Sequence, residues 1–168
     1  MKGGMASMSE EPFRWKDYTV ENVYRRMSEQ TRDEIVRFWV ENRVLPPRIA
    51  ARRVPQIVYV IRVGGGDIMG VNTVYISGFG DNREPYYFFR MFIRPDRRGS
   101  FGLMKFIAGR TYHFLKEYHD VDPMPKGIVY VMENRKFHGG GMKRWIERYG
   151  LCYYGKNERG QDIWYEQF

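Results

Sequence analysis

The stretch "IRPDRRGSFGLMKF", residues 93–106, joins the end of an apolar strand pattern to the start of a helical one. It combines Arg97 and Arg98 with two glycines, Gly99 and Gly102, and the small Ser100. The first turn of a helix leaves backbone N–H groups without partners, and glycine lets a ligand approach them closely. The corner therefore predicts a site for an anion the size of a phosphate. A simple turn beside solvated arginines is the other interpretation that these residues allow.

Strand and helix patterns extend from this corner in both directions. In chain order we expect a strand within 13–24, a helix from Thr31 to "LPP" at 45–47, strands at 56–63, 68–76 and 86–94, a helix over 99–118, a strand at 127–134, a helix at 142–150, and strands at 151–156 and 162–168. Thr31 and Glu34 have the spacing of a capping box, and "RIAARR" (48–53) is expected to be a basic connector. The order β-α-β-β-β-α-β-α-β-β predicts antiparallel hairpins and one right-handed βαβ crossover through the 99–118 helix.

Composition limits the class of protein. The chain has 168 residues, a net charge of +8, 43% hydrophobic residues and one cysteine, Cys152. These values predict an ordered protein without an internal disulfide, and an anionic partner. We expect a flexible tail or an expression remnant at 1–12 and a single domain at 13–168. Because no apolar run has the length of a membrane helix, no membrane partner and a cytoplasmic location are expected.

The corner and the order of elements resemble the GNAT superfamily, the Gcn5-related N-acetyltransferases. "I-R-P" at 93–95 and "R-R-G-S-F-G" at 97–102 are similar to the family's motif A, with Ser100 standing where a glycine is usual. The resemblance covers Phe13 to Phe168 and implies a mixed α+β fold. That fold would have a twisted, mostly antiparallel sheet of about six to seven strands, a splayed parallel pair, and about three to four flanking helices.

The resemblance also implies a binding site for acetyl-CoA or another acyl-CoA. Its pyrophosphate would lie on the amides of the corner, and the pantetheine arm would lie along the preceding strand. The residues implied in binding are Met91, Phe92, Ile93, Arg97, Arg98, Gly99, Ser100, Phe101, Gly102, Leu103 and Asn134. A loop cap is an equally open interpretation of Asn134.

Catalytic residues follow less directly from the resemblance. The family's acid is a tyrosine on the helix after the asparagine strand, and Tyr149 carries the only suitable hydroxyl near that place. Glu133 is the nearest acid on the neighbouring strand and is the candidate base. Packing for Tyr149 and a solvated role for Glu133 are the alternatives. His138, beside a glycine-rich loop, is a further candidate, and no metal site is expected.

The expected function is therefore an acyl-CoA-dependent N-acyltransferase that transfers an acyl group directly to an amine. One alternative is a degenerate GNAT-fold protein that only binds. Another keeps the enzyme but makes the acceptor a nucleic acid or a protein associated with one, since arginines and aromatic residues alternate in several segments. The acceptor, the acyl chain and the oligomeric state, a dimer included, stay open.

Overall fold

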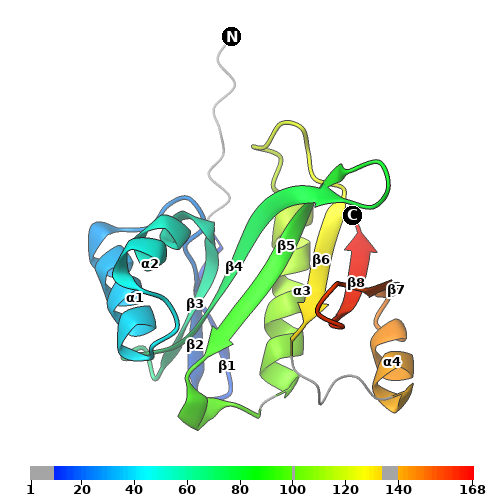
Figure 1. Ribbon diagram of the computed structural model, residues 1–168. Helices are drawn as coiled ribbons and strands as arrows, with labels where there is room; N and C mark the ends of the chain where they lie inside the picture. The colour runs from blue at the N-terminus through cyan, green and yellow to red at the C-terminus, as the bar shows by residue number, and fades with distance from the viewer. Residues whose placement is uncertain (1–9, 100, 134–139) are drawn as a thin grey trace. The chain divides into compact units, whose positions relative to one another are not determined.

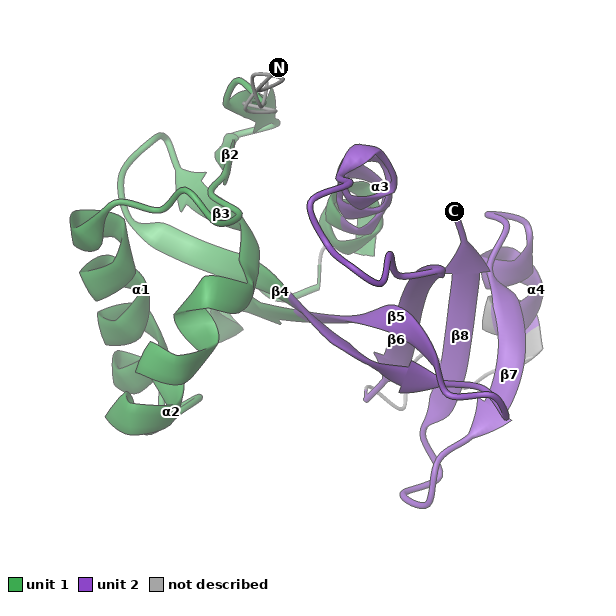
Figure 2. Cartoon of the chain, turned by 90° about the horizontal axis from the view of Figure 1, so that it is seen from above, with its two compact units in different colours: residues 1–73, 91–107 green, residues 74–90, 108–168 purple. Residues whose placement is uncertain are grey.

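The computed structural model describes residues 10–99, 101–133 and 140–168 (Figure 1). The chain divides into two compact units (Figure 2). Unit 1 consists of residues 1–73 and 91–107, and unit 2 consists of residues 74–90 and 108–168. Strands β4 (Ile68–Phe79) and β5 (Glu84–Ile93) and helix α3 (Phe101–Glu117) each pass from one unit into the other.

Unit 1 packs two helices over antiparallel strands. Its further elements are β1 (Phe13–Trp15), β2 (Tyr18–Asn22), α1 (Glu29–Glu41), α2 (Pro47–Arg53), the 3₁₀ turn η1 (Val54–Gln56), β3 (Ile57–Val63) and the 3₁₀ turn η2 (Pro95–Arg97). Helix α1 buries one apolar stripe, because Ile35, Phe38 and Trp39 lie in one core cluster. Strand β3 joins that cluster through Ile57 and Val60, which are fully buried.

Unit 2 contains the C-terminal strands. Its further elements are β6 (Gly127–Met132), α4 (Gly140–Glu147), β7 (Cys152–Lys156) and β8 (Asp162–Gln167). The second half of α3 buries Thr111, Phe114 and Leu115, which are three and four residues apart and so lie on one face of the helix. Gly150, after α4, has a φ of +84°, the left-handed conformation in which many helices end.

The strands confirm the expected α+β class with a mixed sheet. Among the described residues, eight strands follow the order β1-β2-β3-β4-β5-β6-β8-β7. Strands β5 and β6 are parallel and are joined by α3, as the βαβ crossover requires, whereas β6 and β8 are antiparallel. The paired residues of β5 and β6 run from Tyr87 opposite Ile128 to Phe89 opposite Tyr130, and β5 then continues to Ile93.

Three expectations near the N-terminus are wrong in detail. The first strand pattern is two strands, because the chain turns at Lys16 with a left-handed φ of +53°. The first helix begins at Glu29 rather than at a capping box of Thr31, since the Ser28 hydroxyl accepts the Thr31 N–H at 3.1 Å. The expected basic connector is helix α2, because the proline at position 47 suits the first turn of a new helix.

No helix within the described ranges is long and apolar enough to cross a membrane.

Candidate functional site

The corner between β5 and α3 has the backbone that its sequence predicts. Strand β5 ends at Ile93, and the Arg94 N–H donates to the Met69 carbonyl at 2.8 Å. The short turn η2 follows, and Gly99 adopts a φ of +107°, which side chains rarely tolerate. Helix α3 begins two residues later, at Phe101. A strand therefore leads through a glycine turn directly into the start of a long helix.

The two glycines of the corner differ in their surroundings. A Cβ atom built on Gly99 would meet nothing within 4 Å, so this side of the turn is open. A Cβ atom on Gly102 would lie 3.4 Å from Cζ2 of Trp15. Gly99 therefore allows a ligand to approach the backbone, whereas Gly102 brings the helix close to an indole ring.

Part of the corner's hydrogen-bonding capacity is used within the turn. The Phe101 N–H donates to the Gly99 carbonyl at 3.2 Å, and the Arg98 N–H makes a long 3.4 Å contact with the Pro95 carbonyl. The Arg98 side chain folds back onto β5, where its Nε donates to the Ile93 carbonyl at 3.1 Å and its guanidinium lies 5.4 Å from the ring centre of Phe92. Ser100 lies outside the described residues.

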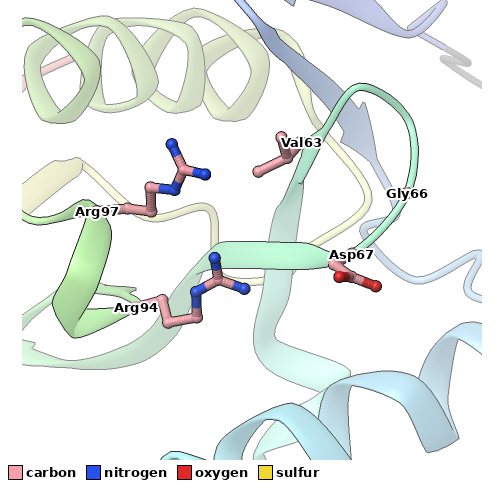
Figure 3. A pocket seen from close by; sticks show the side chains of 5 residues that line it. All are labelled: Val63, Gly66, Asp67, Arg94 and Arg97. Carbon is pink, nitrogen blue, oxygen red and sulfur yellow. The ribbon is translucent and has the colours of Figure 1, made fainter.

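An arginine pair beside the corner lines a hollow of about 320 Å³. The lining residues are Val63, Gly66, Asp67, Arg94 and Arg97 (Figure 3). Arg94 donates to Asp96 through Nε at 2.6 Å and Nη2 at 2.9 Å, and Arg97 lies 3.8 Å from the same carboxylate. The hydrogen bond from Arg94 lowers the pKa of Asp96. Arg94 and the hollow were not predicted from the sequence. The available signal was the spacing Arg-x-Asp at 94–96, which allows an ion pair beside the corner.

The residues expected along the pantetheine arm lie at the end of β5. Met91, Phe92 and Ile93 are half-buried, and the Phe92 ring packs 5.6 Å from that of Phe38 on α1. Gly70 of β4 lies against the same backbone, because a Cβ atom there would be 3.1 Å from the Phe92 carbonyl oxygen. Leu103, at the start of α3, is fully buried, so its side chain belongs to the core.

The expected catalytic residues are exposed. Tyr149 is 44% exposed and packs edge-on against Trp145, with the ring centres 4.4 Å apart. Glu133 is exposed directly after β6. Asn134 and His138 lie outside the described residues. The structure therefore puts Tyr149 and Glu133 on separate segments of unit 2, one after α4 and one after β6.

Unit 2 also contains a partly buried polar pair that was not predicted from the sequence. The Tyr130 hydroxyl donates to Oε1 of Glu166 at 2.6 Å. Burial raises the pKa of Glu166 above its ordinary value, although the hydrogen bond from Tyr130 opposes that shift. Burial, together with the Glu166 charge, also raises the pKa of Tyr130. The only signal in the sequence was a tyrosine within one strand pattern and a glutamate within another.

A second polar group joins β7 to β8. The buried carboxylate of Asp162 accepts from the Tyr153 hydroxyl and from Nζ of Lys156, both through Oδ1 and both at 2.9 Å. On α4, the Lys143 ammonium lies 4.0 Å from the Tyr153 ring centre. Within the described part of the chain, no three His, Cys, Asp or Glu side chains gather in a metal-binding group.

Comparisons with known proteins identify the fold. No protein-family model matches the chain, and no curated protein matches it. A solved structure from Bordetella pertussis, assigned to the GNAT family of acetyltransferases, superimposes with a TM-score of 0.62 at 12% identity, covering 95% of this chain and 100% of that one. The GNAT-family acetyltransferase of Streptococcus pneumoniae gives 0.58 at 9% identity, with 90% and 99% covered. Arabidopsis thaliana NAA60 in complex with acetyl-CoA gives 0.53 at 11% identity, with 90% and 97% covered. The chain therefore has the GNAT fold.

Proposed function

We propose that this chain, which has the GNAT fold, is an acetyl-CoA-dependent N-acetyltransferase. The observation that carries the proposal is the corner between β5 and α3. There, Gly99 at a φ of +107° leaves the turn open at the start of a 17-residue helix. Such a helix start attracts the diphosphate of a CoA thioester through its N–H groups and its dipole. Solved structures of the same fold include one in complex with acetyl-CoA.

In this proposal the corner holds the phosphates and β5 holds the rest of the cofactor. The pyrophosphate lies against the corner formed by residues 98–103, and Arg97 contributes positive charge. The backbone of Met91, Phe92 and Ile93 pairs with the amide groups of the pantetheine arm. Arg98 already donates to the Ile93 carbonyl. Arg98 would therefore connect the phosphate end of the site to the strand.

The reaction is direct transfer. The amine nitrogen attacks the thioester carbonyl, the C–S bond breaks, and an N–C bond forms to give an amide and the CoA thiol. A base must take a proton from the ammonium, and an acid must protonate the leaving thiolate. We assign these roles to Glu133 and Tyr149, with Asn134 as a further contact to the cofactor.

Thermal unfolding with and without acetyl-CoA tests the proposal, because a ligand that binds only the folded state raises its stability. We expect acetyl-CoA and CoA each to raise the Tm of the intact chain. If neither acetyl-CoA nor CoA raises the Tm at saturating concentration, the assignment is refuted. Binding without transfer to any amine would instead identify a GNAT-fold protein that binds but does not catalyse.

A matched pair of variants tests where the phosphates bind. Gly99→Val places a side chain at a φ of +107°, and Gly160→Val does so at +73° in the open turn between β7 and β8. Both changes introduce backbone strain of about 1–3 kcal/mol. We expect only Gly99→Val to lose the rise in Tm with acetyl-CoA. Equal responses in the two variants would show that the phosphates bind elsewhere.

A further inference from the structure

Arg90 is a cation within the apolar and aromatic stretch 86–93 of strand β5. Its guanidinium carbon lies 3.9 Å from the ring centre of Tyr75, which places the cation over the face of the ring. The Tyr75 ring packs in turn against Phe88, with the ring centres 5.2 Å apart. All three side chains are half-buried and belong to unit 2. The Tyr75 ring therefore covers one side of the Arg90 guanidinium.

Arg90 differs from Arg62 and Arg94, two half-buried arginines that lie within a strand or directly after one. Arg62 binds Glu34 at 2.5 Å, and Arg94 binds Asp96 at 2.6 Å. Within the described residues, Arg90 makes no ion pair and no hydrogen bond, and its guanidinium contacts the Tyr75 ring instead. A partly buried charge is costly unless it is paired, and an aromatic face compensates for only part of that cost.

The stacking also determines which part of Arg90 is available. A ring face accepts the charge of a guanidinium but takes none of its N–H hydrogen bonds, and a guanidinium that stacks flat keeps its N–H edge available for another partner. That edge matches the two oxygens of a carboxylate, which it binds through two parallel hydrogen bonds. The Arg90 edge therefore has the chemistry of an anion-binding fork.

The position of Arg90 separates it from the proposed phosphate site. Residues alternate across a strand, so Arg90 shares a face of β5 with Phe88, whereas Phe89 faces the other way and packs 5.3 Å from Tyr130. Arg90 follows the last paired residue of the parallel ladder, Phe89, and precedes the stretch 91–93 proposed for pantetheine. Along the chain, residues 91–93 therefore separate Arg90 from the corner. An anion at Arg90 would therefore belong to a second molecule rather than to the CoA phosphates.

We propose that Arg90, oriented by Tyr75, binds a carboxylate on the amine acceptor, so that the acceptor is an amino acid or a similar carboxylate-bearing amine. This inference rests on the proposed acetyl-transfer function and adds the class of acceptor to it. Arg90 contacts the substrate but takes no part in proton transfer. Tyr75 is a positioning residue, because it acts by holding the guanidinium.

The test compares amines that differ only in their charged group. The intact chain is supplied with acetyl-CoA and one amine at a time. Amino acids are compared with their carboxamides, which lack the carboxylate, and O-phosphoethanolamine is compared with ethanolamine, which lacks the phosphate. Release of the CoA thiol gives the rate, and mass spectrometry identifies the acetylated amine. We expect the amino acids to react and their carboxamides to react far more slowly. Equal rates, a preference for the phosphate-bearing amine, or no acetylated amine at all would each overturn the carboxylate assignment.

Variants then assign the preference to Arg90. Loss of a charge-assisted hydrogen bond lowers affinity by about ten- to a hundred-fold, so Arg90→Met should raise the KM for amino acids by that factor and leave the carboxamides unchanged. Arg148→Met removes an exposed arginine of the same unit and should change neither value. Tyr75→Leu should raise the same KM by a smaller factor, and Tyr75→Phe should restore it. An unchanged amino-acid KM in Arg90→Met would overturn the inference.

The rise in Tm with acetyl-CoA separates a failure of the acetyl-transfer function from a failure of the acceptor assignment. Arg90→Met should keep the wild-type rise, because the variant leaves the corner intact. If wild-type protein shows no rise, the acetyl-transfer function fails and the acceptor assignment fails with it. If the rise is present and carboxylate-bearing amines have no advantage, only the acceptor assignment fails.

Discussion

Gly127, the first residue of β6, occupies a position where the backbone of β8 leaves no room for a side chain. A Cβ atom built there would lie 2.0 Å from the Glu166 carbonyl oxygen and 2.9 Å from Cα of Gln167. Gln167 is the residue that pairs with Gly127. Both neighbouring atoms are backbone, so no side-chain rotation relieves the clash, and Gly127→Ala must open the end of the ladder.

The expected loss follows from those contacts. Overpacking in a closed site costs about 1–3 kcal/mol, and each ladder hydrogen bond that opens adds about 1 kcal/mol. The 3.0 Å hydrogen bond from the Phe168 N–H to the Lys126 carbonyl is next to the clash and should be affected as well. We therefore expect Gly127→Ala to lower the free energy of unfolding by about 3 kcal/mol, or the Tm by roughly 6–12 °C in a chain of this size.

Urea unfolding, monitored by tryptophan fluorescence, measures the change. An m-value equal to that of the wild type shows that the same unfolding transition is compared in both proteins. Gly109→Ala is the matched control, because Gly109 lies within α3 and a Cβ atom there would meet nothing within 4 Å. Replacing a helical glycine by alanine should raise the free energy of unfolding by up to about 1 kcal/mol. If Gly127→Ala unfolds within about 0.5 kcal/mol of the wild type, the packing of β6 against β8 described above is wrong.

Three smaller changes test other parts of the structure. Burial raises the pKa of Glu166, so the folded state keeps its proton longer than the unfolded state, and stability falls as pH rises above the ordinary carboxyl value of 4.5. Glu166→Gln keeps an acceptor for the Tyr130 hydroxyl but does not ionise, so it does not lose stability in this way. The unfolding midpoint of the variant minus that of the wild type should therefore increase from about pH 4 to pH 7, and a decrease would contradict the assignment. Tyr153→Phe removes the 2.9 Å hydrogen bond to the buried Asp162 and should cost about 1–3 kcal/mol in denaturant unfolding, whereas an unchanged midpoint would show that the bond contributes nothing. Ser28→Ala removes the cap of α1 and should cost about 1 kcal/mol by the same measurement, with Ser28→Asp as the variant that retains it.

Periodicity in the sequence was enough to predict most of the fold. The helical spacing of apolar residues predicted α1 and α3, and Ile35 and Leu115 on these helices are fully buried. The failures occur where one residue type allows two structures. Pro47 was interpreted as the end of one helix although it opens the next, and a turn at Lys16 lacks the glycine that would have indicated it.

The candidate site was less predictable than the fold, because a motif specifies backbone and not side-chain partners. The glycine turn at Gly99 follows from the sequence, since few other residues adopt its φ. The return of Arg98 onto the Ile93 carbonyl does not follow, because a long side chain has many rotamers and the choice depends on packing. The contact of Arg90 with Tyr75 joins positions on two strands, which a single sequence does not pair.

The division of the chain has a consequence for engineering. The boundaries fall after residues 73, 90 and 107, inside β4, β5 and α3, so each unit is assembled from two separate segments. No single break in the gene yields either unit as one continuous polypeptide. A chimaera that exchanges one unit with that of a relative would need three junctions, each within a regular element, where register must be preserved to the residue. Recombination at the loops, the usual choice for chimaeras, would divide both units.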